Sequence, residues 1–177
     1  MKRRAFRRRL GGDERGVALV EFACVLPVLL LMYLGGYQLT DALSCNRKVT
    51  ITARAVADLT TQNATVTTDQ VNTILNASSK ILAPYSVANA LVRVTEFTTD
   101  AGGTTKVTWS MDNKGGGRTK GDTYTLPANI KVNGSSIIFS EVIYNYRPAV
   151  TFSIVKPLTL SDTVFMNPRV SNSVDMQ

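Results

Sequence analysis

The strongest pattern along the chain is an apolar run close to its start, "ERGVALVEFACVLPVLLLMYLGGY" at residues 14–37. The 19 residues from Phe22 to Thr40 carry no charge, and a helix needs about 20 residues to cross the hydrocarbon core of a bilayer. Eleven Leu, Phe or Val side chains between residues 17 and 37 contribute about −3 to −7 kcal/mol to insertion, whereas Glu21 costs at most about 2.5 to 3.5 kcal/mol. The run therefore predicts a membrane-spanning helix.

Helical spacing of apolar residues continues beyond this run, through "NRKVTITARAVADL" at residues 46–59. The pattern predicts one helix from near Val17 to about Leu59. Pro27 should bend this helix, because a proline removes one backbone hydrogen bond and crowds the preceding turn. Gly35-Gly36 is a second soft point or a place of close helix contact.

After a polar break at residues 60–65, the segment 67–82 reads as a second helix, capped by Thr68 or Asp69 and ended by Pro84. The spacing then changes to the period of two that is typical of strands. Strands are expected at 90–100, 104–112 and 135–148, and a final strand within 158–170 is expected to end at Pro168. The order of elements predicts an α+β fold in which a long kinked N-terminal transmembrane helix packs on a small antiparallel β-sheet with one extra helix.

The side chains of the first strand are expected to alternate between two faces of the sheet. Leu91, Arg93, Thr95 and Phe97 share one face, and Val92, Val94 and Glu96 share the other. The later segment "NKGGGRTKGDT" (113–123) is expected to be an exposed flexible loop, and Trp109, Tyr144 and Tyr146 are read as side chains that pack on a sheet face.

Charge is concentrated at the start of the chain. The formal net charge is +7, and residues 1–16 hold seven basic and two acidic side chains, a net +5. The other 161 residues are close to neutral, with no basic stripe of the kind that binds nucleic acid. The basic flank keeps the N-terminus in the cytoplasm, so the rest of the chain is expected on the other side of the membrane.

Catalytic and metal-binding motifs are weak in this sequence. It has no histidine, so no Ser/His or Cys/His pair is available, and no cofactor or metal is expected. Residues 113–123 lack the residue order of a phosphate-binding loop. Asp100, Asp112 and Asp122 are read as turn residues rather than calcium ligands.

The two cysteines, Cys24 and Cys45, lie about 30 Å apart on one helix, which excludes a disulfide between them. Both are read as small apolar residues. Cys24 is expected to face lipid or a partner helix, and Cys45 to be a free thiol or an intermolecular link.

Glu21 gains a role if the chain is cut after Gly16. Val17 then becomes the first residue, and the Glu21 carboxylate lies one helical turn from a new α-ammonium group, near the positive end of the helix dipole. This carboxylate can pair with its own ammonium group or with that of a neighbouring subunit, and in an apolar bundle a paired carboxylate can set the register between subunits. The alternative is an interfacial residue at the start of an ordinary membrane anchor.

The stretch "RGVALVEFACVLPVLLL" resembles the leader and first helix of prepilins, and in particular the TadE-like (TadE/TadF type) minor pilins or pseudopilins of the Tad (tight adherence, Flp pilus) system. The shared features are Gly16, Val17, Glu21, the aromatic Phe22 and Pro27. "EVIYNYRP" (141–148) and "DTVFMNPRV" (162–170) resemble the aromatic-proline strand and the final Met-Xaa-Pro-Arg segment of TadE/TadG-like domains.

This resemblance implies a pilin-like fold and a structural role rather than an enzymatic one. A prepilin peptidase would cut between Gly16 and Val17, which divides the chain into a cytoplasmic leader (1–16), a transmembrane and periplasmic helix (17–60) and a periplasmic α+β domain (61–177). The protein would remain in the bacterial inner membrane or enter an extracellular adhesion pilus. Its partners would be the major pilin, other minor pilins, the Tad inner-membrane assembly platform and the prepilin peptidase.

Two readings of other classes stay open. One is a membrane-anchored periplasmic binding module or sensor whose leader is never removed. The other is an exported domain that is cut near Cys45, either by lipoprotein processing at "DALSC" or by an ordinary signal peptidase after Ser44.

Overall fold

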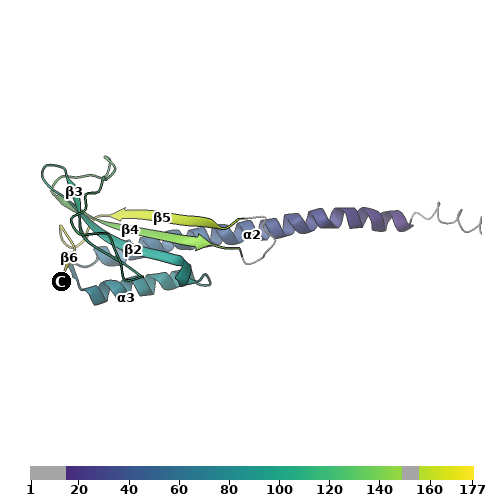
Figure 1. Ribbon diagram of the computed structural model, residues 1–177, viewed down its shortest axis with the longest axis horizontal. Coiled ribbons are helices and arrows are strands. Elements are labelled where there is room, and N and C mark those ends of the chain that lie inside the picture. Colours follow the sequence, from purple (N-terminus) through teal and green to yellow (C-terminus); the bar gives the residue numbers. More distant parts are fainter. Residues whose placement is uncertain (1–14, 149–155) are drawn as a thin grey trace, which may run out of the picture.

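A single helix, α2 (Arg15–Thr61), runs along most of the length of the molecule (Figure 1). The computed structural model describes residues 15–148 and 156–177, so nearly all of the expected leader lies outside the described residues. The 47 residues of α2 correspond to about 70 Å of helix. The expected helix is confirmed to within two residues at each end. It continues through Pro27 without a break, and the bend at Pro27 stays a prediction.

The second helix, α3 (Thr68–Ser79), is also present, but its cap is Thr67, not Thr68 or Asp69 as expected. The reason is a reciprocal pair of hydrogen bonds. The Gln70 backbone N–H donates to the Thr67 hydroxyl at 3.2 Å, and the Thr67 N–H donates to Gln70 Oε1 at 2.9 Å. Such a capping box satisfies two backbone donors that the helix itself cannot. A short 3₁₀ turn, η1 (Lys80–Leu82), follows and ends before Pro84.

Four antiparallel strands form the sheet in the order β3-β2-β4-β5. Their bounds are β2 (Ala90–Thr99), β3 (Thr105–Asp112), β4 (Ser135–Tyr146) and β5 (Leu158–Met166), with a 3₁₀ turn η2 (Val87–Asn89) ahead of β2. All four expected strands exist. β4 and β5 each end two residues earlier than expected, at Tyr146 rather than Pro148 and at Met166 rather than Pro168. A proline has no N–H to give to the ladder of strand hydrogen bonds.

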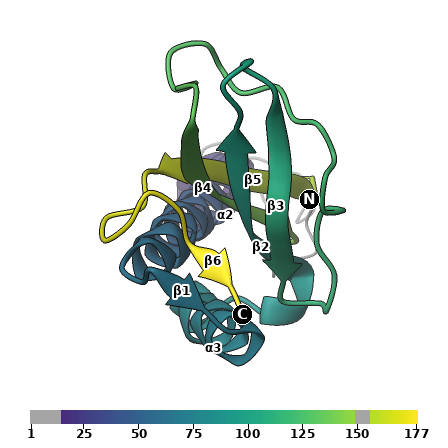
Figure 2. The same cartoon turned by 90° about the vertical axis from the view of Figure 1, so that its left-hand side faces the viewer.

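One face of the sheet packs against α2 and α3 and forms the main core, as the end-on view shows (Figure 2). The predicted faces of β2 are confirmed in that Val92 and Val94 belong to this core, whereas Phe97 belongs to a second apolar cluster. The register between β2 and β3 shifts at Glu96/Phe97, where Glu96 pairs with Trp109 and Phe97 pairs with Val107. This bulge places Trp109 in the main core and Val107 in the second cluster, although strict alternation would put both on one face.

The second cluster is built around Phe97, Val107, Leu126, Ile137 and Phe139. Leu126 comes from the segment after the glycine-rich loop, so this part of the chain folds back onto the sheet. The loop 113–123 is largely exposed, as expected, but it is also held by defined contacts. The Asp112 carboxylate accepts backbone hydrogen bonds from Lys114 and Gly116, each at 2.9 Å.

The C-terminal segment returns to the end of α2, an arrangement that the sequence pattern did not predict. β6 (Asp175–Met176) pairs in parallel with β1 (Thr65–Val66), beside α3 (Figure 2). The Gln177 N–H donates to the Val66 carbonyl at 3.0 Å, and the Arg169 N–H donates to the Thr61 carbonyl at 3.0 Å. The chain between residues 169 and 177 therefore closes the end of the core that lies farthest from the apolar half of α2.

Candidate functional site

The first half of α2 carries a continuous exposed apolar surface. The helix is long and apolar enough to cross a membrane, and none of its most apolar window is buried in the protein. The large exposed side chains of this half are Val17, Leu19, Val20, Phe22, Val25, Leu26, Val28, Leu29, Leu30, Leu31, Met32 and Tyr33. Because so large an apolar surface requires lipid or other helices around it, this half of α2 is the leading candidate for a membrane and assembly site.

The residues expected at a processing and register site all lie at the start of this surface. Gly16, Val17, Glu21 and Phe22 occupy the first two turns of α2, and all four are exposed. Val17 and Glu21 are four residues apart, so they lie on the same face of the helix. Among the described residues, Glu21 takes part in no ion pair. Its carboxylate is therefore available to a partner outside the chain.

The second half of α2 is fixed to the sheet by Asp41. The Tyr85 hydroxyl donates to Asp41 Oδ1 at 2.8 Å, and the Tyr146 hydroxyl at the end of β4 donates to Asp41 Oδ2 at 2.6 Å. Burial, followed by these bonds to the carboxylate, raises the pKa of both tyrosines above their ordinary value. Both hydroxyls thus stay protonated and donate. The cluster joins the helix to the sheet at the point where α2 leaves its exposed apolar half.

Cys45 lies one turn after Asp41 and is fully buried. Burial, with a smaller contribution from the Asp41 charge, raises the pKa of the Cys45 thiol to about 11. A buried and protonated thiol is a poor nucleophile. The expected intermolecular link is therefore wrong for the folded domain, and the reading of Cys45 as a small apolar residue is confirmed. Cys24 is exposed on the apolar half, as expected.

Glu96 is the most unusual side chain of the core, because it is an acid with no exposed surface. One oxygen, Oε1, accepts a hydrogen bond from the Val174 N–H at 2.8 Å. The Val174 carbonyl accepts a hydrogen bond from Trp109 Nε1 at 2.7 Å, so the backbone of the C-terminal segment is held on both sides. Burial is the main reason that the pKa of Glu96 is raised to about 7. The periodic pattern placed Glu96 beside Val92 and Val94 but gave no sign of this contact.

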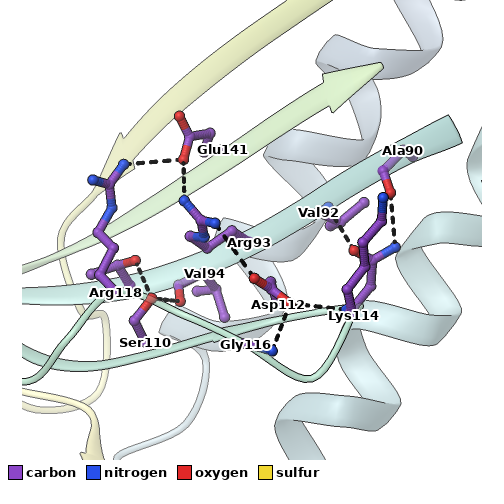
Figure 3. A network of polar contacts seen from close by, with 12 residues as sticks. Ala90, Val92, Arg93, Val94, Ser110, Asp112, Lys114, Gly116, Arg118 and Glu141 are labelled. Atoms are coloured by element: carbon purple, nitrogen blue, oxygen red, sulfur yellow. Dashed lines mark hydrogen bonds and ion pairs between the residues drawn. The ribbon is translucent and has the colours of Figure 1, made fainter. Parts of the chain in front are cut away.

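A second polar network lies on the other face of the sheet (Figure 3). Glu141 Oε2 accepts from Arg93 at 3.3 Å and from Arg118 at 3.1 Å, and Arg93 also lies 3.5 Å from Asp112. Burial opposes ionisation of Asp112, but the backbone donors at Gly116 and Lys114, together with Arg93, lower its pKa below the usual value. The charges satisfy one another, which indicates a structural clamp on the loop 113–123.

Nothing in the described part of the chain gathers groups for catalysis or metal binding. No cluster of three or more Cys, Asp or Glu side chains able to hold a metal ion occurs there. Asp100, Asp112 and Asp122, which were read as turn residues, form no such cluster. The carboxylates of Asp41, Glu96, Asp112 and Glu141 accept hydrogen bonds from backbone or neighbouring side chains. The exposed apolar half of α2, which carries Glu21, is therefore the strongest candidate for a functional surface.

That same helix carries the sequence match. Residues 16–58 match the family model of TadE-like proteins. The match begins at Gly16 and ends in the last turns of α2, so the predicted resemblance is confirmed for this TadE-like helix. TadE-like proteins are structural components of the Tad pilus system. The similarity noted for residues 141–148 and 162–170 lies outside the match and stays a prediction. No curated protein and no solved structure gives a significant match.

Proposed function

We propose that this chain is a minor pilin or pseudopilin, a structural subunit that initiates, caps or assembles a Tad-type adhesion pilus. The observation that carries the proposal is the TadE-like helix itself, which is exposed and apolar over its first half and fixed to a sheet domain over its second. A subunit of this design can remain anchored in the inner membrane, with its domain in the periplasm, or pass into a filament through the same helix. The processing site is the bond between Gly16 and Val17.

Glu21 is the residue that we assign to subunit register. Its carboxylate is exposed on an otherwise apolar helix surface, one turn from Val17. An unpaired carboxylate is costly in such surroundings, so it favours the one arrangement of neighbouring helices that brings a cation to it. The α-ammonium group of a processed neighbour supplies that cation. The major pilin, other minor pilins and the Tad assembly platform are the partners that this role requires.

The first test of this function is the N-terminus of the protein in membranes of its native host. We expect intact-mass and N-terminal peptide measurements to show a chain that starts at Val17, and to show Met1 retained when the prepilin peptidase is deleted. Met1 in both strains would make the chain an uncleaved membrane anchor with a binding or sensory domain. A start at Cys45 would make the chain an exported or lipidated domain rather than a pilin, although such a cut would pass through the middle of α2.

A Glu21→Ala variant tests the register role separately from processing. Loss of the carboxylate removes a cost of insertion, so the variant should insert and be cut after Gly16 like the wild type. It should nevertheless support few or no pili, counted by electron microscopy of cells in which it replaces the wild-type chain. Glu21→Asp, which keeps the charge, serves as the matched control and should retain more pili than Glu21→Ala. Equal piliation in the Glu21→Ala variant and the wild type would contradict the register role.

A further inference from the structure

The sheet presents one end toward the apolar half of α2, and the pairing of its strands defines which residues lie there. β4 runs toward that half of the helix and β5 runs away from it (Figure 1). The last pair of residues that joins β4 to β5 at this end is Tyr146 with Leu158. Arg147 follows Tyr146 directly, and Lys156 stands two residues before Leu158. Both cations therefore lie just beyond the last strand pair, at the end of the domain nearest the predicted membrane.

The Asp41 cluster sets the height of this end relative to the membrane. From Val17 to Gln38 the helix rises about 32 Å, which is close to the thickness of about 30 Å of the hydrocarbon core. Asp41 lies three residues farther, at the level of the lipid headgroups. Because Asp41 binds the Tyr146 hydroxyl at 2.6 Å, the end of β4 is held at the same level. Arg147, the next residue along the chain, is exposed at this end of the sheet.

The charge at this end is positive. Arg147 and Lys156 are both exposed, and neither makes an ion pair among the described residues. Asp41, the acid at this level, accepts a tyrosine hydroxyl on each carboxylate oxygen. The next acid along β5, Asp162, pairs with Val142, four residues farther from this end. Residues 149–155 carry no charge in the sequence, so the two cations set the electrostatics of the surface.

Apolar and aromatic side chains accompany the two cations. Leu158 is exposed at the start of β5, and Tyr37 is exposed on α2 one turn before Asp41. Aromatic rings and the stems of long basic side chains are favoured at the boundary between lipid and water. Gly35-Gly36 precedes this level, and a side chain at Gly36 would meet nothing within 4 Å. Two adjacent glycines weaken a helix, so an added contact beside them restrains the tilt of the domain.

We propose that Arg147, Lys156, Leu158 and Tyr37 form a headgroup-docking surface, which binds anionic phospholipids of the leaflet from which α2 emerges on the side of the domain. The chemistry recognised is the phosphate of the lipid headgroup. The contact holds the domain in one orientation above the bilayer. This inference rests on the membrane span of the proposed function, and it adds a second membrane contact to the helix.

The test uses the full chain in vesicles of phosphatidylcholine, with or without phosphatidylglycerol. A donor dye is placed on Ser161→Cys in a Cys24→Ala background, since buried Cys45 does not compete for the dye, and an acceptor dye is placed on the lipid headgroups. Energy transfer in the otherwise wild-type chain should rise when phosphatidylglycerol is present and fall again at high salt. Removal of both cations in Arg147→Gln/Lys156→Gln should lower the ratio of docked to undocked domains about 30-fold. This change corresponds to about 2 kcal/mol for the two cations together, because a tenfold change corresponds to about 1.4 kcal/mol.

The matched control is Lys106→Gln/Lys131→Gln, which removes two exposed cations at the opposite end of the sheet, beside the turn that joins β2 to β3. This variant should behave like the wild type. Energy transfer that is independent of phosphatidylglycerol, or equal in the two double variants, would overturn the headgroup-docking surface. Flotation of the vesicles separates the two proposals. A chain that floats but shows no lipid dependence defeats this inference alone, whereas a chain that does not float defeats the membrane span as well.

Discussion

An Asp41→Ala variant is expected to lose about 3 to 6 kcal/mol of the free energy of unfolding. Asp41 accepts hydroxyl hydrogen bonds from Tyr85 and Tyr146 at 2.8 and 2.6 Å, and bonds to a charged acceptor contribute about 1.5 to 3 kcal/mol each. The Tyr146 side chain is almost fully buried, so its hydroxyl would be left without this partner away from water. Urea unfolding of the full chain in detergent micelles, followed by the fluorescence of Trp109, measures the loss.

Asp58→Ala is the matched control for Asp41→Ala. Asp58 is also an acid on α2 and also has a partner, Arg169, at 2.5 Å, but the two side chains are 39% and 56% exposed. Exposed pairs of this kind contribute at most about 1 kcal/mol. The Tyr85→Phe/Tyr146→Phe variant removes both hydroxyls, so a further Asp41→Ala change in that background should have a much smaller effect. A loss of the same size for Asp41→Ala and Asp58→Ala would show that the tyrosine cluster does not fix the helix to the sheet.

Glu96 is expected to make the domain less stable as the pH rises from about 4.5 to 7. Burial raises the pKa of this carboxyl from 4.5 to about 7 in the folded domain, with a smaller contribution from Asp175, and the Val174 N–H opposes the shift. The folded state therefore holds a proton that the unfolded state releases in this window. Stability is greatest below pH 4.5, decreases by about 3 kcal/mol up to pH 7 and is flat above it as far as this group is concerned.

A Glu96→Gln variant isolates this effect, because its side chain is neutral at every pH. The difference in unfolding free energy between the variant and the wild type should shift in favour of the variant by about 3 kcal/mol between pH 4.5 and pH 8. Urea unfolding at these two pH values measures it. Asp122→Asn removes an exposed loop carboxylate instead and should give the same difference at both. A constant difference for Glu96→Gln would mean that Glu96 ionises in the folded domain at its ordinary pKa.

Local periodicity was sufficient to predict α2, α3 and the four strands of the main sheet, because each is long enough to repeat its pattern several times. The TadE-like helix was also readable, since Gly16, Glu21 and the apolar run lie close together in the sequence. The cap of α3 was missed although its signal was present. Thr67 and Gln70 have the three-residue spacing of a capping box, and they should have been preferred over Thr68 or Asp69.

The remaining features depend on contacts between distant residues, and no local pattern reveals them. Glu96 is tolerated in the core because Val174, 78 residues away, supplies a backbone donor. Asp41 depends on Tyr146, 105 residues away. β1 and β6 have two residues each, too few to show a period. The bulge opposite Glu96 and Phe97 changes the face of half of β3, so the alternation of that strand misleads when it is read alone.

The hydrogen bonds of Val174 with Glu96 and Trp109 affect the order of folding and export. Glu96 and Trp109 lie far earlier in the sequence than Val174. Contacts of large sequence separation form slowly, because the chain must first close a long loop. While the segment that contains Val174 has not yet emerged, Glu96 lacks its backbone partner and the end of the core stays open. A domain that crosses the membrane, as proposed, can therefore complete its core only after almost the whole chain has passed.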